Sequence, residues 1–374
     1  MKITDVVATP VSMKLTESRW WGAMASPTIG CIIVEVKTDQ GIIGLGEAGF
    51  TSMYWPSVGP IITETLKPLI VGEDPLLIEQ LFTKMHRATH GWGRRGFQTY
   101  AVSGIEIALW DILGKVAGLP IWRLLGGFQK SIPAYWAPCL KPAKVIAKEC
   151  EGAVKAGFQA IKLRVGLGLE EDRKIVRSVR KAVGEEVALM VDANMSYDYR
   201  TAVSMAEEFL ELGVKWLEEP IETHSLTQYI EEHARLNEST DMPLSGGESL
   251  FTRWEFVEVF HQRAFDVVQP DAVSVGGIAE TKKIAAMASA YNIPCVPHIA
   301  CSSVSGIGFV ANLHVIGSLD NALYVEYDAY DSPIRDELFR EPVKAEKGAV
   351  QMPTKPGLGL ELNRKAMAKY AMKP

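Results

Sequence analysis

The fold is decided by three short apolar segments that each end in acidic residues: LMVDANMSY (189–197), WLEEP (216–220) and GGES (246–249). Asp192, Glu218 and Glu248 follow one another at intervals of 26 residues (192 to 218) and 30 residues (218 to 248). One strand-plus-helix unit of a parallel α/β barrel has about this length, so successive strands would bring one carboxylate each to the same rim. The spacing therefore predicts a barrel with three acids at one end.

Three carboxylates that converge at one rim repel one another unless a cation lies between them. An all-oxygen, anionic ligand set suits a hard divalent ion, so we predict that Asp192, Glu218 and Glu248 bind Mg²⁺, with Mn²⁺ as the possible substitute. A single acid at a strand end is more often a helix cap or a solvated loop residue. Three acids at the repeat spacing favour the metal site.

Length and composition favour a protein with a barrel and a smaller second domain. The chain has 374 residues, 47% hydrophobic and 22% charged, which is typical of a globular protein. The net charge of −6 and the lack of a basic run disfavour nucleic acid as a partner. The N-terminal sequence lacks the apolar core of a signal peptide, no apolar run is long enough for a membrane span, and the five cysteines are scattered. We therefore expect a cytoplasmic protein without a membrane partner.

Residues 1–126 are predicted to form an α+β capping domain. Extended segments lie between Lys2 and Val36, a hairpin turn is expected in 38–49, and helical periodicity runs from 58 to 126. The polar segment LTESRWWGAMASPTIG (15–30) is expected to be a long loop. This segment and TSMYWPS (51–57) carry four aromatic residues that form either a lid over a substrate or a contact with a neighbouring domain: Trp20, Trp21, Tyr54 and Trp55.

Residues 127–338 alternate short apolar strands with amphipathic helices. The predicted strands are 132–137, 160–165, 188–193, 215–219, 243–247, 266–270, 294–298 and 323–327. Eight strands with seven intervening helices make an α/β fold of the (β/α)7β type, a modified TIM barrel whose chemistry lies at the C-terminal ends of the strands. The C-terminal segment 339–374 is expected to return to the capping domain and complete it.

The other polar strand ends suggest acid–base chemistry. Lys162 and Arg164 are separated by one residue, so both side chains point toward the barrel mouth, where they bind either a substrate carboxylate or the barrel acids. Asp271 and His298 lie one repeat apart, so the carboxylate would orient the imidazole as a general base. Glu326, at the end of the last strand, could hold a proton or bind an oxyanion.

The ordered motifs resemble the mandelate racemase subgroup of the enolase superfamily. They are GLGEAG (44–49), ALWDILGKVAGLPIWRLLGG (108–127), IKLR (161–164), VDAN (191–194), WLEEP (216–220), GGES (246–249), PDAVSVGG (270–277), PH (297–298), VE (325–326) and PGLG (356–359). The resemblance implies a Mg²⁺ site on the three acids, Lys162 against the substrate carboxylate, and His298 with Asp271 as the base. It also implies that Asn194 and Glu326 are electrophilic hydrogen-bonding groups, that the aromatic loops close over the substrate, and that the protein is a homo-oligomer.

One departure from the subgroup's pattern limits the chemistry. The subgroup commonly has a second lysine where this chain has Arg164, and arginine is a poor base because it stays protonated. Chemistry with one base is therefore expected: His298 removes the α-proton of a sugar acid or hydroxy acid, and a β-hydroxyl leaves to give a 2-keto-3-deoxy acid. The alternatives are cycloisomerisation of a sugar-acid lactone or anhydro sugar acid, racemisation or epimerisation of a 2-hydroxy acid, and a sugar-acid-binding protein without catalysis.

Overall fold

The computed structural model describes residues 1–21, 24–300, 306–328, 330 and 332–372. The chain begins with an antiparallel sheet of three strands in sequential order, β1 (Ile3–Trp21), β2 (Met24–Thr38) and β3 (Ile43–Glu47). Helix α4 (Phe97–Ala117) packs directly on this sheet. The approach is close because β3 carries glycines, and a Cβ atom at Gly44 or Gly46 would overlap a carbonyl group of α4.

The rest of the capping domain is helical, as the periodicity predicted. Its helices are α1 (Trp55–Pro60), a π-helical turn (Ile61–Leu66), α2 (Lys67–Ile70), α3 (Ile78–Ala88), α4 and α5 (Ile121–Leu124), with 3₁₀ turns at Ser52–Tyr54 and His90–Trp92.

The prediction of a loop at residues 15–30 is wrong. Strands β1 and β2 continue as an antiparallel pair as far as Trp21 and Met24, so most of this segment is a long hairpin. Arg19 near its end forms an ion pair with Asp328 of the barrel at 3.0 Å. The main-chain oxygen of Trp20 accepts a hydrogen bond from the Leu140 N–H at 3.1 Å. These stabilising partners are far away in sequence, which is why the polar composition alone suggested a loop.

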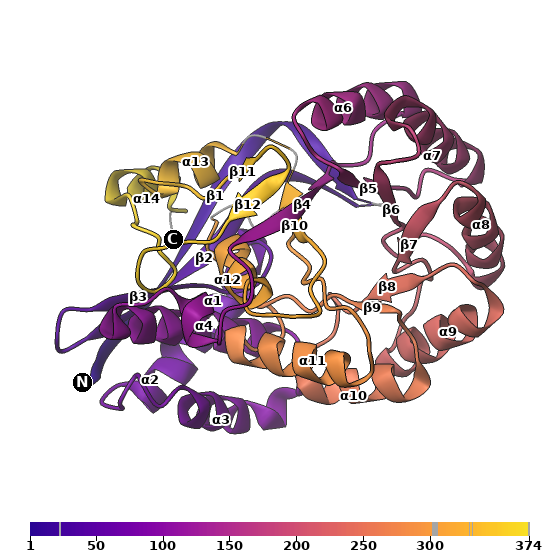
Figure 1. Cartoon of the computed structure of the whole chain (residues 1–374). Coiled ribbons are helices and arrows are strands. Elements are labelled where there is room, and N and C mark those ends of the chain that lie inside the picture. The colour runs from indigo at the N-terminus through magenta and orange to yellow at the C-terminus, as the bar shows by residue number, and fades with distance from the viewer. Residues whose placement is uncertain (22–23, 301–305, 329, 331, 373–374) are drawn as a thin grey trace.

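The barrel strands pair in parallel in the predicted order, and the last strand pairs with the first to close the ring. They are β4 (Ser131–Ala137), β5 (Ala160–Arg164), β6 (Ala188–Asp192), β7 (Val214–Glu218), β8 (Leu244–Gly246), β9 (Val267–Val268) and β10 (Val325–Asp328). Figure 1 shows the helices around them: α6 (Ala143–Lys155), α7 (Leu169–Val183), α8 (Tyr199–Glu211), α9 (Leu226–Ser239), α10 (Thr252–Gln262), α11 (Ile278–Ala290) and α12 (Ile307–Ile316).

The strand predicted at 294–298 is reduced to a single bridge between Val268 and Cys295. Its main chain still pairs with β9, because the N–H groups of Val296 and His298 donate to Val268 and Pro270 at 2.9 and 3.2 Å. Prolines 294 and 297 lack N–H donors, which shortens the regular ladder. The (β/α)7β architecture with a capping domain is confirmed.

The C-terminal segment returns to the capping domain, as predicted. It contains α13 (Pro333–Leu338), β11 (Ala345–Glu346), β12 (Ala349–Gln351) and α14 (Arg364–Tyr370). Strand β12 pairs with β4 of the barrel, and α14 packs on β1. Figure 1 shows α13 and α14 next to the N-terminal sheet. The domain limits at residues 126 and 338 stay predictions.

Three buried acids of the capping domain join it to the barrel and the C-terminal segment through main-chain N–H groups: Glu47, Glu106 and Asp111. Glu47 accepts from Gly308 at 2.9 Å, in the first turn of α12. Glu106 accepts from Ile278 and Ala279 at 2.7 and 2.9 Å, in the first turn of α11. Asp111 accepts from Leu45 and Leu358 at 2.9 and 2.8 Å, and so ties the C-terminal segment to β3.

No helix in the described part of the chain is long and apolar enough to cross a lipid bilayer.

Candidate active site

Strand register places the predicted polar residues at one level of the barrel. Arg164 lies opposite Asp192 in the β5–β6 pair, and Asp192 lies opposite Glu218 in the β6–β7 pair. All three side chains are buried. The repeat spacing of the sequence thus corresponds to neighbouring strand ends, as expected for acids that share one rim.

Lys162 lies among three of the predicted acids. Its Nζ is 2.7 Å from Glu218 Oε1, 2.9 Å from Glu326 Oε1 and 3.6 Å from Asp192 Oδ2. Burial alone would lower the pKa of Lys162, but Glu218 and Glu326 hold it well above its usual range. Lys162 is therefore a buried ammonium that compensates the acids in this arrangement.

Glu326 is ionised beside this lysine. Burial would raise its pKa, but Lys162 and His298 lower it to about 2. Its Oε2 accepts a hydrogen bond from the Ile299 N–H at 3.1 Å. Its predicted role as a proton holder or oxyanion partner stays a prediction.

Arg164 is held on the other side of Asp192. Its Nη1 donates to Asp192 Oδ2 at 2.7 Å and to Asn194 Oδ1 at 2.6 Å. The Asn194 N–H also donates to Asp192 Oδ1 at 2.9 Å, in a backbone conformation with φ of +43°. The structure thus brings Arg164, Asp192 and Asn194 together in one hydrogen-bonded group.

Glu248 extends toward the base rather than toward the other two acids. Its Oε2 is 3.2 Å from His298 Nε2. Within the described ranges, no three His, Cys, Asp or Glu side chains are arranged to hold a metal ion. Lys162 lies between Glu218 and Asp192, and Glu248 faces the imidazole, so the three predicted ligands do not converge here.

The donor chemistry nevertheless fits a divalent cation. Burial raises the pKa of Glu218 to about 7, with Asp192, Glu326 and Glu248 adding to the rise and Lys162 opposing it. Burial, together with Asp192, also raises the pKa of Glu248. Oxygen ligands that repel one another in this way are relieved by a hard cation, so the donor atoms of Asp192, Glu218 and Glu248 suit a divalent ion.

His298 and Asp271 form the predicted pair. His298 Nδ1 is 3.1 Å from Asp271 Oδ2. Burial would lower the pKa of His298, but Glu248 and Asp271 raise it to about 10. The protonated imidazole is therefore favoured in this arrangement, in which Glu248 and Asp271 lie at its two ring nitrogens.

Sequence reasoning missed three residues around these groups. Asn312 of α12 donates to Asp271 Oδ1 at 2.7 Å, and Gln269 donates to Glu218 Oε2 at 2.8 Å. The ring of Phe50 meets His298 edge-on, with centroids 5.7 Å apart. Phe50 and Gln269 directly adjoin the GLGEAG and PDAVSVGG motifs, which is a signal that could have found them. Asn312 carries no such signal.

The predicted substrate loops are only partly at the site. Tyr54 stacks on Tyr100 with centroids 5.6 Å apart, next to the Phe50 ring that contacts His298. Trp55 packs on the capping-domain core. Trp20 is 49% exposed near the end of the hairpin, and the Trp21 side chain lies outside the described parts of the chain.

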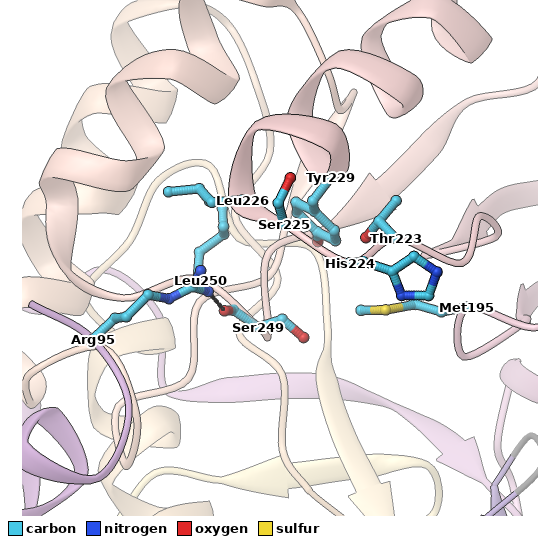
Figure 2. Close-up of a pocket in the computed structure, with 9 residues that line it drawn as sticks. All are labelled: Arg95, Met195, Thr223, His224, Ser225, Leu226, Tyr229, Ser249 and Leu250. Atoms are coloured by element: carbon cyan, nitrogen blue, oxygen red, sulfur yellow. Dashed lines mark hydrogen bonds between the residues drawn. The ribbon is translucent and has the colours of Figure 1, made fainter. Parts of the chain in front are cut away.

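A pocket of about 230 Å³ borders the loops that follow β6, β7 and β8. Figure 2 shows Arg95 of the capping domain beside it, with its Nη2 donating to the Ser249 carbonyl oxygen at 3.1 Å. Met195 and Ser249 line the pocket, and they directly follow Asn194 and Glu248. The pocket thus adjoins two of the loops that carry the candidate site.

Comparison with known proteins matches nearly the whole chain to two family models. The N-terminal domain of mandelate racemase and muconate lactonizing enzyme matches residues 10–126, and the enolase C-terminal domain-like family matches residues 145–366. Arabinonate dehydratase of Saccharolobus solfataricus is 36% identical over 94% of this chain and 93% of its own length. D-galactarolactone cycloisomerase of Agrobacterium fabrum is 31% identical over 100% of this chain and 99% of its own length.

Solved structures agree with this likeness. The 3,6-anhydro-D-galactonate cycloisomerase of Zobellia galactanivorans superposes with a TM-score of 0.89 at 31% identity, covering 100% of both chains. A racemase of Streptomyces coelicolor A3(2) with bound magnesium superposes with a TM-score of 0.88 at 26% identity, covering 99% of this chain and 100% of the racemase.

Proposed function

The chain belongs to the mandelate racemase and muconate lactonizing enzyme family of the enolase superfamily, and from that premise we propose that it dehydrates a sugar acid to a 2-keto-3-deoxy acid with the help of Mg²⁺. The family resemblance predicted from the ordered motifs is confirmed. The relatives include proteins named as dehydratases and a protein named as a cycloisomerase, which supports an enzyme. Lyase chemistry is the leading candidate, and isomerase chemistry is the second.

The observation that carries the proposal is the base-capable pair of His298 and Asp271, together with two buried cations, Lys162 and Arg164, at other strand ends of the same barrel. Asp271 orients His298, so Nε2 is the atom that would take the α-proton of a bound acid. Lys162 and Arg164 would supply positive charge to the substrate carboxylate. A proton removed from the α-carbon leaves an enediolate, and that negative charge is what these cations are placed to stabilise.

Asp192, Glu218 and Glu248 would hold Mg²⁺, which when bound supplies positive charge to the substrate carboxylate. His298, oriented by Asp271, would serve as the base. The proton taken by Nε2 is then returned to the β-hydroxyl, which leaves as water. The enol that remains becomes the 2-keto acid by tautomerisation, so the overall change is loss of one water.

Arg164 favours this route over two-base racemisation. Its guanidinium is bound by Asp192 and Asn194 and stays protonated, so it offers no second base on the face opposite His298. Cycloisomerisation remains the second candidate because it needs the same proton removal with a different leaving group. The full-length likeness to D-galactarolactone cycloisomerase supports it.

The test is a panel of aldonic and aldaric acids with Mg²⁺, assayed for 2-keto acid, alongside sugar lactones and anhydro sugar acids assayed for ring-opened products. We expect 2-keto acid from at least one open-chain acid. Isomerised lactone without water loss from open-chain acids would replace dehydration by cycloisomerisation. Both stereoisomers of recovered substrate in deuterated water would instead favour a racemase.

A His298→Asn variant separates an enzyme from a binding protein. The variant should still bind the acid but lose turnover by about 10³-fold or more, because it lacks the proton acceptor. Wild type that binds sugar acids and converts none of them would support the non-catalytic alternative.

A further inference from the structure

Glu219 connects three loops of the candidate site through its main chain and side chain. Its N–H donates to Ser245 at 3.0 Å, and its carbonyl oxygen accepts from the Met195 N–H at 2.7 Å. Its φ of +36° lies in the left-handed region, which residues with a side chain rarely adopt. The chain therefore turns sharply at Glu219, and its side chain leaves in a different direction from that of Glu218.

The carboxylate of Glu219 is buried and reaches the turn that precedes Glu248. The Tyr229 hydroxyl of α9 donates to Glu219 Oε1. The Gly247 N–H donates to the Tyr229 hydroxyl at 2.9 Å and to Glu219 Oε1 at 3.3 Å. Tyr229 is itself fixed, because its ring packs against Phe265 with centroids 5.5 Å apart. The Gly247 main chain therefore has a defined position set by two side chains.

The glycines of this turn are required by the same packing. Gly247 has a φ of +116°, and a Cβ atom at Gly246 would lie 2.6 Å from the Phe265 ring and 3.0 Å from the Tyr229 hydroxyl. Figure 2 shows Tyr229 and Ser249, the residue after Glu248, lining one pocket. The hydrogen-bonded group thus lies directly beside the chain segment that carries Glu248.

We propose that Glu219 and Tyr229 are positioning residues for the Mg²⁺ ligands. Glu219 adjoins Glu218 in the chain, its carbonyl oxygen fixes the loop that begins at Asp192, and its carboxylate with Tyr229 fixes the turn before Glu248. This inference rests on the proposed Mg²⁺-dependent function. Groups that orient ligands in this way are worth about 10- to 100-fold in metal affinity.

The experiment measures Mg²⁺ binding by isothermal titration calorimetry on the full chain without substrate. Tyr229→Phe removes one hydroxyl without changing the packed ring, and Glu219→Gln keeps the side-chain volume. Each variant should bind Mg²⁺ about 10-fold or more weakly than the wild type. Glu219→Asp, which keeps the carboxyl group but shortens the side chain, should lie between Glu219→Gln and the wild type.

Tyr197→Phe is the matched control. The Tyr197 hydroxyl donates to the buried Asp172 at 2.9 Å, and Asp172 also accepts from the Gly166 and Leu167 N–H groups at 2.9 Å. The control therefore breaks the same kind of tyrosine–carboxylate–main-chain group in the same barrel. Tyr197 itself follows Asp192 in the chain, but its hydroxyl fixes the segment at Gly166 and Leu167 after β5, and that segment carries no proposed Mg²⁺ ligand. Urea unfolding should show similar losses of stability for Tyr197→Phe and Tyr229→Phe, while only the latter loses Mg²⁺ affinity.

The Mg²⁺ affinities of the wild type and the variants can give three outcomes. Weaker Mg²⁺ binding in Tyr229→Phe and Glu219→Gln with normal binding in Tyr197→Phe supports the positioning role. Wild-type affinity in Tyr229→Phe, or equal losses in Tyr229→Phe and Tyr197→Phe, overturns it while leaving the proposed function intact. A wild-type chain that binds no Mg²⁺ overturns the metal-dependent function and this inference together.

Discussion

Two groups of acids in this molecule differ in what surrounds them. The first lies at the barrel strand ends, where Asp192 and Glu218 contact the cations Lys162 and Arg164 and Glu248 contacts His298. The second lies in the capping domain, where each acid accepts hydrogen bonds from main-chain N–H groups: Glu47, Glu106 and Asp111. Asp192, Glu218 and all three capping acids are less than 2% exposed, and the Glu248 side chain is 20% exposed, so burial alone does not explain the difference.

The difference teaches which buried acids call for a cation. A carboxyl group that accepts several N–H bonds has its oxygen atoms satisfied by the main chain where it lies. Carboxylates that face one another raise each other's pKa, and only a positive charge between them removes that repulsion. The first group is therefore a candidate binding site, whereas the second group is a joint between domains.

The largest expected effect is the loss of activity when the first group is changed. Glu218→Gln should lower kcat by about 10³-fold, because a metal contributes several kcal/mol to the stabilisation of developing charge. The stability of the metal-free protein should not fall, since one repelling charge has been removed and Lys162 keeps Glu326 at 2.9 Å. Steady-state kinetics and urea unfolding measure the two quantities. Near-normal turnover would place the metal elsewhere.

Changing the second group should affect stability instead. Glu106→Ala would leave the N–H groups of Ile278 and Ala279 and the Trp110 indole N–H without their buried acceptor. We expect the free energy of unfolding to fall by about 3 kcal/mol, since each unsatisfied buried donor costs about 1–3 kcal/mol. The folded fraction should keep the wild-type kcat. A variant of normal stability with low kcat would mean that the capping acids take part in the site.

Added Mg²⁺ should raise the Tm of the protein only when the first group of acids is intact. Mg²⁺ at about 100 times its Kd should stabilise the wild type by about 2.7 kcal/mol, because it binds only the folded protein. Scanning calorimetry with Mg²⁺ and with EDTA should show a higher Tm with the metal for wild type and Glu106→Gln. Glu218→Gln should show no such shift. An equal shift in all three proteins would indicate a Mg²⁺ site outside the first group.

The first group could be predicted from the sequence because its members repeat. Asp192 and Glu218 follow strands one unit apart, and the strand register places them opposite one another. The second group has no such spacing. Glu47 and Asp111 lie within motifs that were singled out, GLGEAG and ALWDILGK, but a single acid in a strand or helix does not reveal its partner. The Gly44 and Gly46 pair does indicate a close helix contact, and that contact is what buries these acids.

The hairpin of β1 and β2 also shows that partners far away in sequence cannot be predicted from local composition. Residues 15–30 have a polar composition typical of a loop, yet they are mostly extended because Arg19 and the Trp20 main chain have partners on the barrel. The rotamer of Glu248, which faces His298, was likewise beyond prediction. Local sequence indicates which residues reach the rim, whereas the partners that orient them depend on tertiary contacts.

A smaller effect should appear in the pH dependence of stability. Burial raises the pKa of Glu106 from 4.5 to about 8, so between these values the folded protein keeps a proton that the unfolded chain has lost. Stability contributed by that proton is therefore lost as pH rises toward 8. From pH 6 to 7, wild type should lose on the order of 1 kcal/mol more than Glu106→Gln. Parallel urea-unfolding curves for the two proteins would show instead that the N–H donors keep Glu106 ionised.

The smallest effect should come from an exposed ion pair at the same joint. Lys283 of α11 lies 2.6 Å from Glu79 of α3, and the Glu79 side chain is 64% exposed. Exposed pairs are screened by water and must order two long side chains, so Glu79→Gln should change stability by less than about 0.5 kcal/mol. Urea unfolding of this variant beside Glu106→Ala compares two links between the same domains. A loss as large as that of Glu106→Ala would mean that exposed charge, rather than the buried acceptor, holds the capping domain to α11.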